Sequence, residues 1–323
     1  MSKHHYKGPI SDHFNGKVFY NYNGQGSKTF PELMKWLSSR KKVPWGKYRK
    51  QESKKPVGRN ENNDFLVTFV NHSTVLIQTM GLNIITDPVF YKRVSPVQWV
   101  GPKRFTDPGV NLKDLPKIDL VLQSHNHWDH LDIDSLKYIC KRDNSKVITT
   151  LGVSLFLNSS GITNTQELDW WQDTEYNPDL KVNCVPAQHF SGRWLSDRNK
   201  TLWCGFVLEF SNGRKLYFAG DTGYGDFFKS ISEKFGEIDF SLIPIGAYKP
   251  EWFMSSVHIS PKEAVKVHLE VKSKKSMGIH FGSFALADEG LEEPINDLNN
   301  SLSENNMHKE DFITLTEGDN IKI

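Results

Sequence analysis

The sequence predicts an α/β fold with one polar site at the edge of a β-sandwich. Strand-like apolar runs alternate with amphipathic helical segments along most of the chain, which is the pattern of an α/β domain. Several of these runs are followed directly by histidine or aspartate, so residues suited to bind metal collect at strand ends. With 323 residues, the chain is long enough for one large layered domain.

The composition excludes several classes of protein. A hydrophobic content of 37% with 12% aromatic residues allows a sizeable core, and a formal net charge of +2 gives the whole molecule no strong preference for polyanions. The three cysteines, Cys140, Cys184 and Cys204, lack paired or zinc-finger spacing, which indicates reduced thiols. No apolar run approaches the length of a bilayer span, and the N-terminus has no signal-peptide core. We therefore expect a cytoplasmic protein, with peripheral membrane contact left open.

Residues 1–60 are expected to form an N-terminal extension to a catalytic domain that covers residues 61–323. A capping box from Thr29 to Glu32, with Pro31 inside it, predicts the start of a helix. This helix is amphipathic, because apolar residues recur at helical spacing: Phe30, Leu33, Met34 and Leu37. The arm before it has no period, and we interpret its histidines as exposed surface residues: His4, His5 and His13.

A basic linker follows the predicted helix. Residues 40–59 hold nine lysines and arginines against a single acidic residue, Glu52, with Trp45 and Tyr48 among them. Basic residues interleaved with aromatic ones suit an anionic membrane surface or a nucleic acid. They are also typical of a solvated linker, which we favour slightly, with membrane contact second. The sequence leaves open whether the extension also builds a homodimer.

A β-meander opens the predicted catalytic domain, with strands over residues 65–70, 73–77 and 82–85. It ends at Asp87, a carboxylate that can both cap a turn and orient a metal-binding histidine from behind. His72 lies near the start of the second strand, where a place beside the site and a place in the core are equally good interpretations.

The chain is organised around residues 118–132. A short apolar strand over residues 120–122 is followed by four ligand-type residues: His125, His127, Asp129 and His130. Imidazoles and carboxylates are the usual protein ligands of zinc and similar ions. His125 and His127 share a face on an extended backbone, whereas Asp129 and His130 are adjacent and point differently, so they can reach a second metal ion. A polar loop with exposed histidines is the alternative, but such a density at a strand end is rare by chance.

The same arrangement recurs in the second half of the chain. Three further strands lead to ligand-type residues: residues 180–185 to His189, a hairpin over residues 203–218 to Asp221, and residues 275–279 to His280. Asp221 stands between two glycines, which suggests a carboxylate on a tight turn. Together with the central motif, these placements fit one site at one edge of a β-sandwich.

The other segments complete the predicted domain. A strand over residues 240–243 leads into an aromatic loop that contains Tyr248, Trp252 and Phe253 and reaches His258. The remaining predictions are a helix capped by Asp134 and ending at Cys140, a strand over residues 146–149, helices over residues 153–158, 260–271 and 292–305, and a closing hairpin over residues 312–315 and 320–323.

The motif His-x-His-x-Asp-His after a strand resembles the metallo-β-lactamase superfamily. The resemblance implies an αββα four-layer sandwich, in which two mixed β-sheets stack face to face with helices outside and the metal ions lie at one edge. It also implies the ligands: one metal ion takes His125, His127 and His189, the other takes Asp129, His130 and His280, and Asp221 bridges both. Two zinc ions are expected, although manganese or iron also suits these ligands.

Within that superfamily, the chain resembles the N-acyl-phosphatidylethanolamine-hydrolysing phospholipase D family. The segments that carry this resemblance lie between residues 65 and 295: residues 86–88, 95–96, 101–105, 124–132, 186–190, 220–224, 244–248, 252–254, 258 and 279–287. The resemblance implies a phosphodiesterase of phospholipase D type. A hydroxide between the metal ions would attack phosphorus and release phosphatidic acid and an N-acylethanolamine from a phospholipid substrate.

The resemblance also implies roles around the metal ions. Asp129 is expected to be essential for catalysis, and His258 is expected to contact the substrate phosphate or transfer a proton. A histidine that merely precedes a helix is an equally good interpretation of His258. Tyr248, Trp252 and Phe253 are expected along the path of the lipid tails, with simple packing as the alternative.

Other activities of the same fold are alternatives. A lactonase acting on a sugar phosphate would use the same ligands with a small polar pocket, and the aromatic loop argues mildly against it. An RNA-processing hydrolase would use the basic linker, but the low net charge argues against a nucleic acid partner. A metal-binding scaffold without catalysis is disfavoured because the ligand set is complete. Lys103 and Arg104 could meet a phosphate, but we expect them on the solvated surface.

Overall fold

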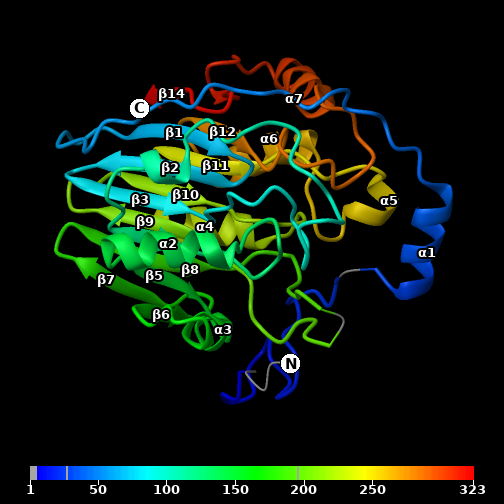
Figure 1. Cartoon of the computed structure of the whole chain (residues 1–323), viewed down its shortest axis with the longest axis horizontal. Helices are drawn as coiled ribbons and strands as arrows, with labels where there is room; N and C mark the ends of the chain where they lie inside the picture. Colours follow the sequence, from blue (N-terminus) through cyan, green and yellow to red (C-terminus); the bar gives the residue numbers. More distant parts are fainter. Residues whose placement is uncertain (1–5, 27, 195) are drawn as a thin grey trace.

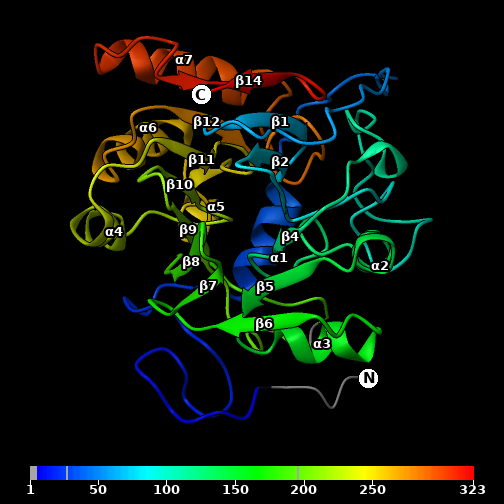
Figure 2. The same ribbon diagram turned by 90° about the vertical axis from the view of Figure 1, so that its left-hand side faces the viewer.

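The computed structural model of the protein describes residues 6–26, 28–194 and 196–323. Two seven-stranded sheets lie face to face, and helices cover the outer side of each sheet (Figure 1; Figure 2). The strand order is β14-β1-β2-β3-β4-β5-β6 in the first sheet and β13-β12-β11-β10-β9-β8-β7 in the second. The predicted αββα arrangement of two mixed sheets is confirmed.

The elements have the following bounds. The first sheet contains β1 (Leu66–Asn71), β2 (Thr74–Thr79), β3 (Leu82–Thr86), β4 (Leu120–Leu122), β5 (Lys146–Thr150), β6 (Thr165–Leu168) and β14 (Asn320–Lys322). The second sheet contains β7 (Asp173–Asn177), β8 (Leu180–Val185), β9 (Gly205–Phe210), β10 (Lys215–Phe218), β11 (Phe240–Pro244), β12 (Ser276–Ile279) and β13 (Phe312–Ile313). The helices are α1 (Phe30–Ser39), α2 (Ile133–Asp143), α3 (Val153–Ser159), α4 (Phe227–Phe235), α5 (Glu251–Met254), α6 (Pro261–Glu270) and α7 (Glu293–Glu304), with a 3-10 turn η1 (Leu112–Asp114).

Each sheet has an antiparallel half and a parallel half. In the first sheet, β14, β1, β2 and β3 pair antiparallel, and β3 to β6 pair parallel. In the second sheet, β7 to β10 pair antiparallel, and β10 to β13 pair parallel. As a consequence, β1, β3 and β4 share one direction, and so do β8, β10, β11 and β12. The segments that follow these strands therefore meet at one edge of the sandwich.

Apolar residues on both faces of the first sheet hold the layers together. Val75 and Ile77 of β2 face the large core between the sheets, which continues to α4 and α6 beyond the second sheet. Leu76, between them, faces a second core under α2 and α3. Successive side chains of a strand point to opposite faces, so a strand buried on both sides is a continuous apolar run. This is why the sequence shows runs here and not a clean alternation.

Helix boundaries follow local capping chemistry. α6 begins after Ser260, whose hydroxyl accepts the backbone N–H of Glu263, while the Glu263 carboxylate accepts the backbone N–H of Ser260, as the capping box predicts. The predicted cap of α2 at Asp134 is wrong. The cap is Asp132, whose carboxylate accepts the backbone N–H groups of Asp134 and Ser135 at 3.1 Å.

The predicted closing hairpin is also wrong. β13 pairs parallel with β12 in the second sheet, whereas β14 pairs antiparallel with β1 in the first sheet. The turn between them carries the chain from one sheet to the other, and the Gly318 N–H donates to the Phe69 carbonyl at 2.7 Å. Two apolar runs around a turn are the local pattern of a hairpin. Here each run pairs with a strand distant in the sequence, β13 with β12 and β14 with β1.

The N-terminal arm packs against the rest of the fold. His13 is only 3% exposed; its ring stacks on Trp170 with centroids 4.5 Å apart, and its Nε2 lies 2.7 Å from an oxygen of Asp169. The prediction that His13 is a surface residue is therefore wrong, and His4 and His5 lie outside the described residues. Phe14 and Phe19 join the large core, so the arm is part of the packed structure.

The basic linker runs from α1 across the molecule to β1, as the blue segment in Figure 1 shows. Five of its cations form ion pairs with acidic residues of the domain: Arg40 with Asp288, Arg49 with Glu317, Lys54 with Asp319, Lys55 with Asp114 and Arg59 with Asp119. Only the pair of Lys54 with Asp319 is exposed at both ends, and an exposed pair contributes at most about 1 kcal/mol to stability. Together the pairs engage much of the positive charge, which supports the interpretation of residues 40–59 as a linker.

Candidate metal centre

Three imidazoles form the first group of ligand atoms. His125 and His127 follow β4, and His189 follows β8 of the opposite sheet. His125 Nε2 lies 2.9 Å from His127 Nδ1, and His189 Nε2 lies 3.1 Å from the same Nδ1. Three ring nitrogens that converge in this way can share one divalent cation.

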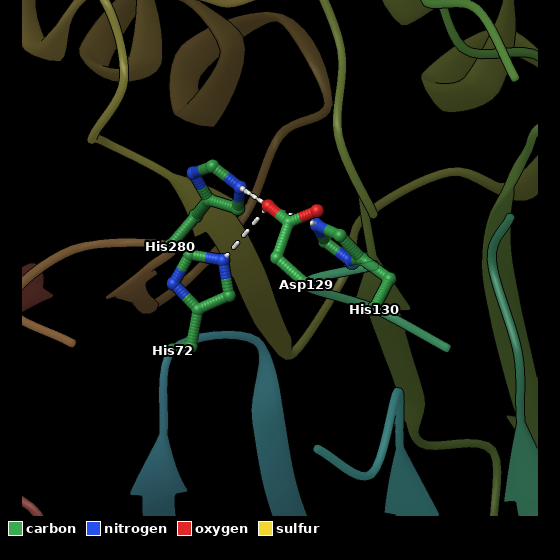
Figure 3. Close-up of side chains that lie close together, drawn as sticks. All are labelled: His72, Asp129, His130 and His280. Atoms are coloured by element: carbon green, nitrogen blue, oxygen red, sulfur yellow. Dashed lines mark hydrogen bonds and ion pairs between the residues drawn. The ribbon is translucent and has the colours of Figure 1, made fainter. Parts of the chain in front are cut away.

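The second group contains Asp129, His130 and His280, together with His72 (Figure 3). The Nε2 atoms of His280 and His72 each lie 3.3 Å from Asp129 Oδ2, and His130 Nε2 lies 3.7 Å from it. The ligand-type atoms of all four residues lie within 4.8 Å of one another. Of the two interpretations of His72 that the sequence leaves open, the structure selects the place beside the site.

Asp221 lies between the two groups. It follows β10 on a tight turn in which Gly220 has a φ of +61°. Its Oδ2 lies 3.0 Å from His280 Nε2 and 3.1 Å from His130 Nε2 in the second group, and 3.7 Å from His189 Nε2 in the first. Contact with both groups is what a bridging ligand requires.

Buried atoms without partners fit bound cations. Nε2 of His130, Nε2 of His280 and Oδ1 of Asp221 are buried and have no hydrogen-bond partner in the described part of the chain. A buried polar atom left unpaired costs about 1–3 kcal/mol, and coordination of a cation would remove that cost. The donor set of imidazole nitrogens and carboxylate oxygens suits zinc, manganese or iron. The chain therefore has buried clusters consistent with a dinuclear metal site.

The two groups differ in charge. Burial alone would lower the pKa of His280, but Asp221 and Asp129 raise it to about 9. Burial alone would raise the pKa of the Asp221 carboxyl, but His130 and His280 hold it well below its ordinary value. In the first group, burial lowers the pKa of His125 well below its ordinary value. The first group thus offers neutral imidazoles, whereas the second must release protons to bind a cation.

Hydrogen bonds behind the rings fix their orientation. His130 Nδ1 donates to Asp87 Oδ2 at 2.6 Å, and His189 Nδ1 donates to the Val257 carbonyl at 2.8 Å, so each ring keeps Nε2 for a cation. Asp87 also accepts the backbone N–H and the hydroxyl of Ser124, at 2.7 and 2.6 Å. The structure places Asp87 behind His130, a candidate metal ligand, which is the position that the sequence suggests for Asp87.

Three residues of the centre have a left-handed backbone conformation. The φ angles are +45° at His72, +31° at Asp87 and +62° at His280. Such conformations cost on the order of 1–3 kcal/mol for residues other than glycine and persist only where the surroundings fix them. His72 and His280 fix each other in part, because the His280 N–H donates to the His72 carbonyl at 2.9 Å.

The N-terminal arm reaches the centre through Asn21, which the sequence analysis missed. The Asn21 amide donates to the His189 carbonyl at 2.9 Å and accepts the His189 N–H at 3.2 Å. Asn21 is 4% exposed. The two residues are 168 positions apart, and Asn21 lies in a segment without periodicity, so no local pattern marks it.

His258 lies beside the centre on the wall of a groove. Its Nδ1 is 3.9 Å from Asp221 Oδ2 and is buried without a hydrogen-bond partner in the described structure. Burial lowers the pKa of His258 to about 4, so its ring is neutral at pH 7. The groove has a volume of about 610 Å³ and lies among α5, α6 and α7. Most of its lining residues are of polar or charged types, among them Glu251, Lys262, Lys266 and Asp297.

The aromatic loop residues lie in different surroundings. Tyr248 lines the groove next to His258, and its hydroxyl donates to Asp297 at 2.5 Å. Trp252 is 42% exposed and lines a separate cavity between α1 and α5. Phe253 stacks on Trp36 of α1, with ring centroids 4.7 Å apart. Of these three aromatic residues, Tyr248 is the one in the groove with His258.

Arg104 is not the surface residue that the sequence predicts. It is 4% exposed and donates to the backbone carbonyls of Val89 at 2.9 Å and Tyr91 at 3.1 Å. Its guanidinium also lies over the ring of Phe284, 4.7 Å from the centroid. Arg104 therefore holds together the loop after β3, while its neighbour Lys103 is exposed.

Comparison with known proteins agrees with this geometry. Residues 82–281 match the family model described as the beta-lactamase superfamily domain. N-acyl-phosphatidylethanolamine-hydrolyzing phospholipase D 1 of Caenorhabditis elegans is 39% identical over 289 residues, or 84% of this chain and 81% of that protein. The mitochondrial N-acyl-phosphatidylethanolamine-hydrolyzing phospholipase D of Saccharomyces cerevisiae is 39% identical over 219 residues, or 66% of this chain and 47% of that protein.

A solved structure agrees on the fold. Igni18, a metallo hydrolase from Ignicoccus hospitalis, superposes with a TM-score of 0.62 at 20% identity, covering 80% of this chain and 98% of that chain. The chain is a metal-dependent hydrolase of the metallo-β-lactamase superfamily. Within it, the chain belongs with the N-acyl-phosphatidylethanolamine-hydrolysing phospholipase D proteins, as the sequence motifs indicate.

Proposed function

We propose that this protein is a phosphodiesterase of the phospholipase D type, which hydrolyses N-acyl-phosphatidylethanolamine to phosphatidic acid and an N-acylethanolamine. One observation carries the proposal. Two adjoining ligand groups share Asp221, in a chain 39% identical to an N-acyl-phosphatidylethanolamine-hydrolyzing phospholipase D over 84% of its length. A pair of cations suits phosphodiester hydrolysis because it can stabilise both the attacking and the leaving oxygen.

The chain supplies the ligands and their orientation. The first cation would be held by His125, His127 and His189, the second by Asp129, His130 and His280, and both by Asp221. Two zinc ions bound there, or manganese or iron in their place, would neutralise the phosphoryl oxygens and lower the pKa of a water molecule. The side chains of His280 and Asp129 are 0% and 15% exposed, so these interactions act largely out of bulk water, where they are stronger.

His258 lines the groove and also lies beside the centre, next to Asp221. Because burial lowers its pKa to about 4, the ring is neutral at pH 7 and carries one N–H. A neutral ring can donate that N–H to a phosphoryl oxygen, but it is not an imidazolium acid. Both roles expected for His258 are compatible with a neutral ring, which can donate its N–H to the substrate phosphate and, in proton transfer, can only accept a proton.

The lipid surface would be met by α1 and not by the basic linker. Phe30, Met34 and Leu37 of α1 are 69%, 49% and 47% exposed, whereas Trp36 packs on α5. Figure 1 shows α1 beside α5, outside the sandwich. An exposed apolar helix face suits the interface of a membrane. The helices of the described structure are all too short or too polar to cross a bilayer, so this contact would be peripheral.

The activity is tested with zinc-loaded protein and vesicles that contain N-acyl-phosphatidylethanolamine, in water enriched in oxygen-18. Attack at phosphorus places the label in phosphatidic acid and leaves the N-acylethanolamine unlabelled. The matched variant Asp129→Asn keeps the shape of the side chain and removes its charge, and we expect its turnover to fall by about 100-fold or more. If a soluble phosphodiester is hydrolysed but the lipid is not, the lipid assignment is wrong.

The membrane contact is tested separately by sedimentation with vesicles. Serine in place of Phe30, Met34 and Leu37 should reduce the bound fraction and the turnover of vesicle substrate. Turnover of a soluble phosphodiester should stay unchanged, because these side chains are exposed on α1, which lies outside the sandwich (Figure 1). A variant that binds vesicles as well as the native protein would rule out α1 as the contact.

A sugar-phosphate lactonase is the second candidate, because charged side chains line the groove beside His258. Lys262 and Lys266 with Glu251 and Asp297 suit a small charged ring better than acyl chains. Hydrolysis of a sugar-phosphate lactone, followed as acid release, would favour this activity if the lipid is not cleaved. A nucleic acid substrate is disfavoured, because five cations of the basic linker are engaged in ion pairs.

A further inference from the structure

An additional imidazole adjoins the second group of ligands. His72 lies in the turn between β1 and β2, is 1% exposed, and directs Nε2 at Asp129 Oδ2, 3.3 Å away (Figure 3). Its ring centroid lies 4.1 Å from that of His280. The ligand sets proposed above are complete without His72. The burial of this polar ring beside a proposed metal ligand therefore has to be explained by a function other than that of the seven proposed ligands.

Backbone contacts hold His72 in one place. Its N–H donates to the Ser283 hydroxyl at 2.9 Å, and its carbonyl accepts the His280 N–H at 2.9 Å. Its ring meets the ring of Phe284 edge-on, with centroids 5.3 Å apart. The left-handed φ of +45° is a further constraint, since such a conformation persists only where the surroundings determine it. The backbone conformation and contacts of the turn thus fix the position of His72 Nε2 next to Asp129.

We propose that His72 is a positioning residue of the second metal site, where its Nε2–H donates a hydrogen bond to Asp129 and holds that carboxylate toward the cation. The inference rests on the two-metal centre proposed above. A carboxylate only accepts, so the bond requires the proton on Nε2; Nδ1 is buried without a partner among the described residues. His280 cannot replace His72 as donor, because a ring nitrogen that binds a cation carries no hydrogen.

The hydrogen bond is tested by metal binding to His72→Gln and His72→Leu. The glutamine amide can place an N–H donor near the position of Nε2, whereas leucine fills the space without a donor. We expect native protein to bind two zinc ions in competition with a chromophoric chelator. His72→Leu should bind one of them about 10–100-fold more weakly, and His72→Gln should stay within a few-fold of native. Phe284→Leu keeps an apolar side chain against the His72 ring and leaves the backbone bonds of His72 to Ser283 and His280, so it should change neither ion by more than a few-fold.

Two outcomes would overturn the proposal. If His72→Leu binds both ions as tightly as native protein, the hydrogen bond does not position Asp129. If glutamine and leucine weaken one ion equally, the ring itself matters, as a direct ligand would. Thermal unfolding of the metal-free variants shows whether they are folded before the comparison is made.

A second measurement needs no variant. Long-range proton–nitrogen NMR of the zinc-loaded native protein should show His72 as the Nε2–H tautomer, and an Nδ1–H tautomer would reject the proposal. Neither experiment uses a substrate, so the outcome for His72 does not depend on whether N-acyl-phosphatidylethanolamine is cleaved.

Discussion

Asn21 holds both backbone groups of His189 with one side-chain amide, at 2.9 Å to the carbonyl and 3.2 Å from the N–H. The same Asn21 oxygen also accepts the indole N–H of Trp203 at 3.0 Å. A segment that precedes every strand of the sandwich thus helps to fix a candidate metal ligand. The arm therefore helps to position a residue of the centre and also packs against the core.

The first prediction concerns this amide. Asn21→Ala would leave the N–H and the carbonyl of His189 without partners, which costs about 1–3 kcal/mol for each unsatisfied group. We expect zinc to bind the first group about 10-fold more weakly, with little change at the second group. Calorimetric titration of metal-free protein measures both. Asn23→Ala, which removes a contact to Gln188, is the control, and equal weakening in both variants would indicate general loosening of the arm.

The second prediction concerns Asp87, which lies behind His130. In Asp87→Asn a neutral amide replaces the carboxylate that accepts the His130 Nδ1–H at 2.6 Å. The ring then loses basicity and orientation, and the affinity of the second group should fall about 10–100-fold. Competition with a chelator measures it. An unchanged affinity would show that Asp87 only caps its turn.

The third prediction is a pH dependence. His280 has a pKa of about 9 before metal binds, because Asp221 and Asp129 outweigh the effect of burial. The pKa of His130 is also raised against the effect of burial, by Asp221 and Asp129. A protonated imidazole cannot bind a cation, so affinity at the second group should rise with pH up to about 9, by roughly tenfold per unit for each proton displaced from His280 and His130. Proton release during zinc titration near pH 8 checks the sign. Binding at the first group should vary little above pH 6, since the pKa of His127 is about 4.

The fourth prediction concerns Gly220, just before Asp221. Its φ is +61°, and a Cβ there would lie 2.8 Å from the Cys204 carbonyl and 2.9 Å from Ser124 Cβ. Gly220→Ala should therefore destabilise the protein by about 2–4 kcal/mol and weaken binding of both metal ions. Gly213→Ala is the matched control, because its φ is +83° but its Cβ would meet open space, and it should cost about 1 kcal/mol. Chemical denaturation of both variants measures the difference.

Much of the fold follows from local patterns. Most strands that lead to the centre are largely apolar, and β8 alternates apolar residues with Lys181 and Asn183. The residues after these strands are the ones that the structure brings together. His125 and His280 are far apart in sequence, yet parallel strands carry them to one edge. The sequence therefore suffices to gather the candidate ligands, although their roles remain predictions.

Other features depend on partners that no local pattern names. Asn21 and His72 acquire their place from contacts with distant loops, at His189 and at Ser283. The apolar stripe of α1 predicts a helix correctly, but α1 packs through Trp36 and leaves most of the stripe exposed. In each case, contacts between residues distant in the sequence determine where the side chain lies, and a local sequence pattern does not predict such contacts.

The crossover between β13 and β14 has a consequence for synthesis of the protein. Each of these strands completes one edge of a different sheet, β13 beside β12 and β14 beside β1. Until residue 313 has emerged from the ribosome, β12 keeps an unpaired edge next to the segment that carries His280, and until residue 322 has emerged, β1 keeps one next to His72. Unpaired edges invite intermolecular pairing. The nascent chain should thus depend on chaperones late in translation, and its metal centre should mature only after both edges close.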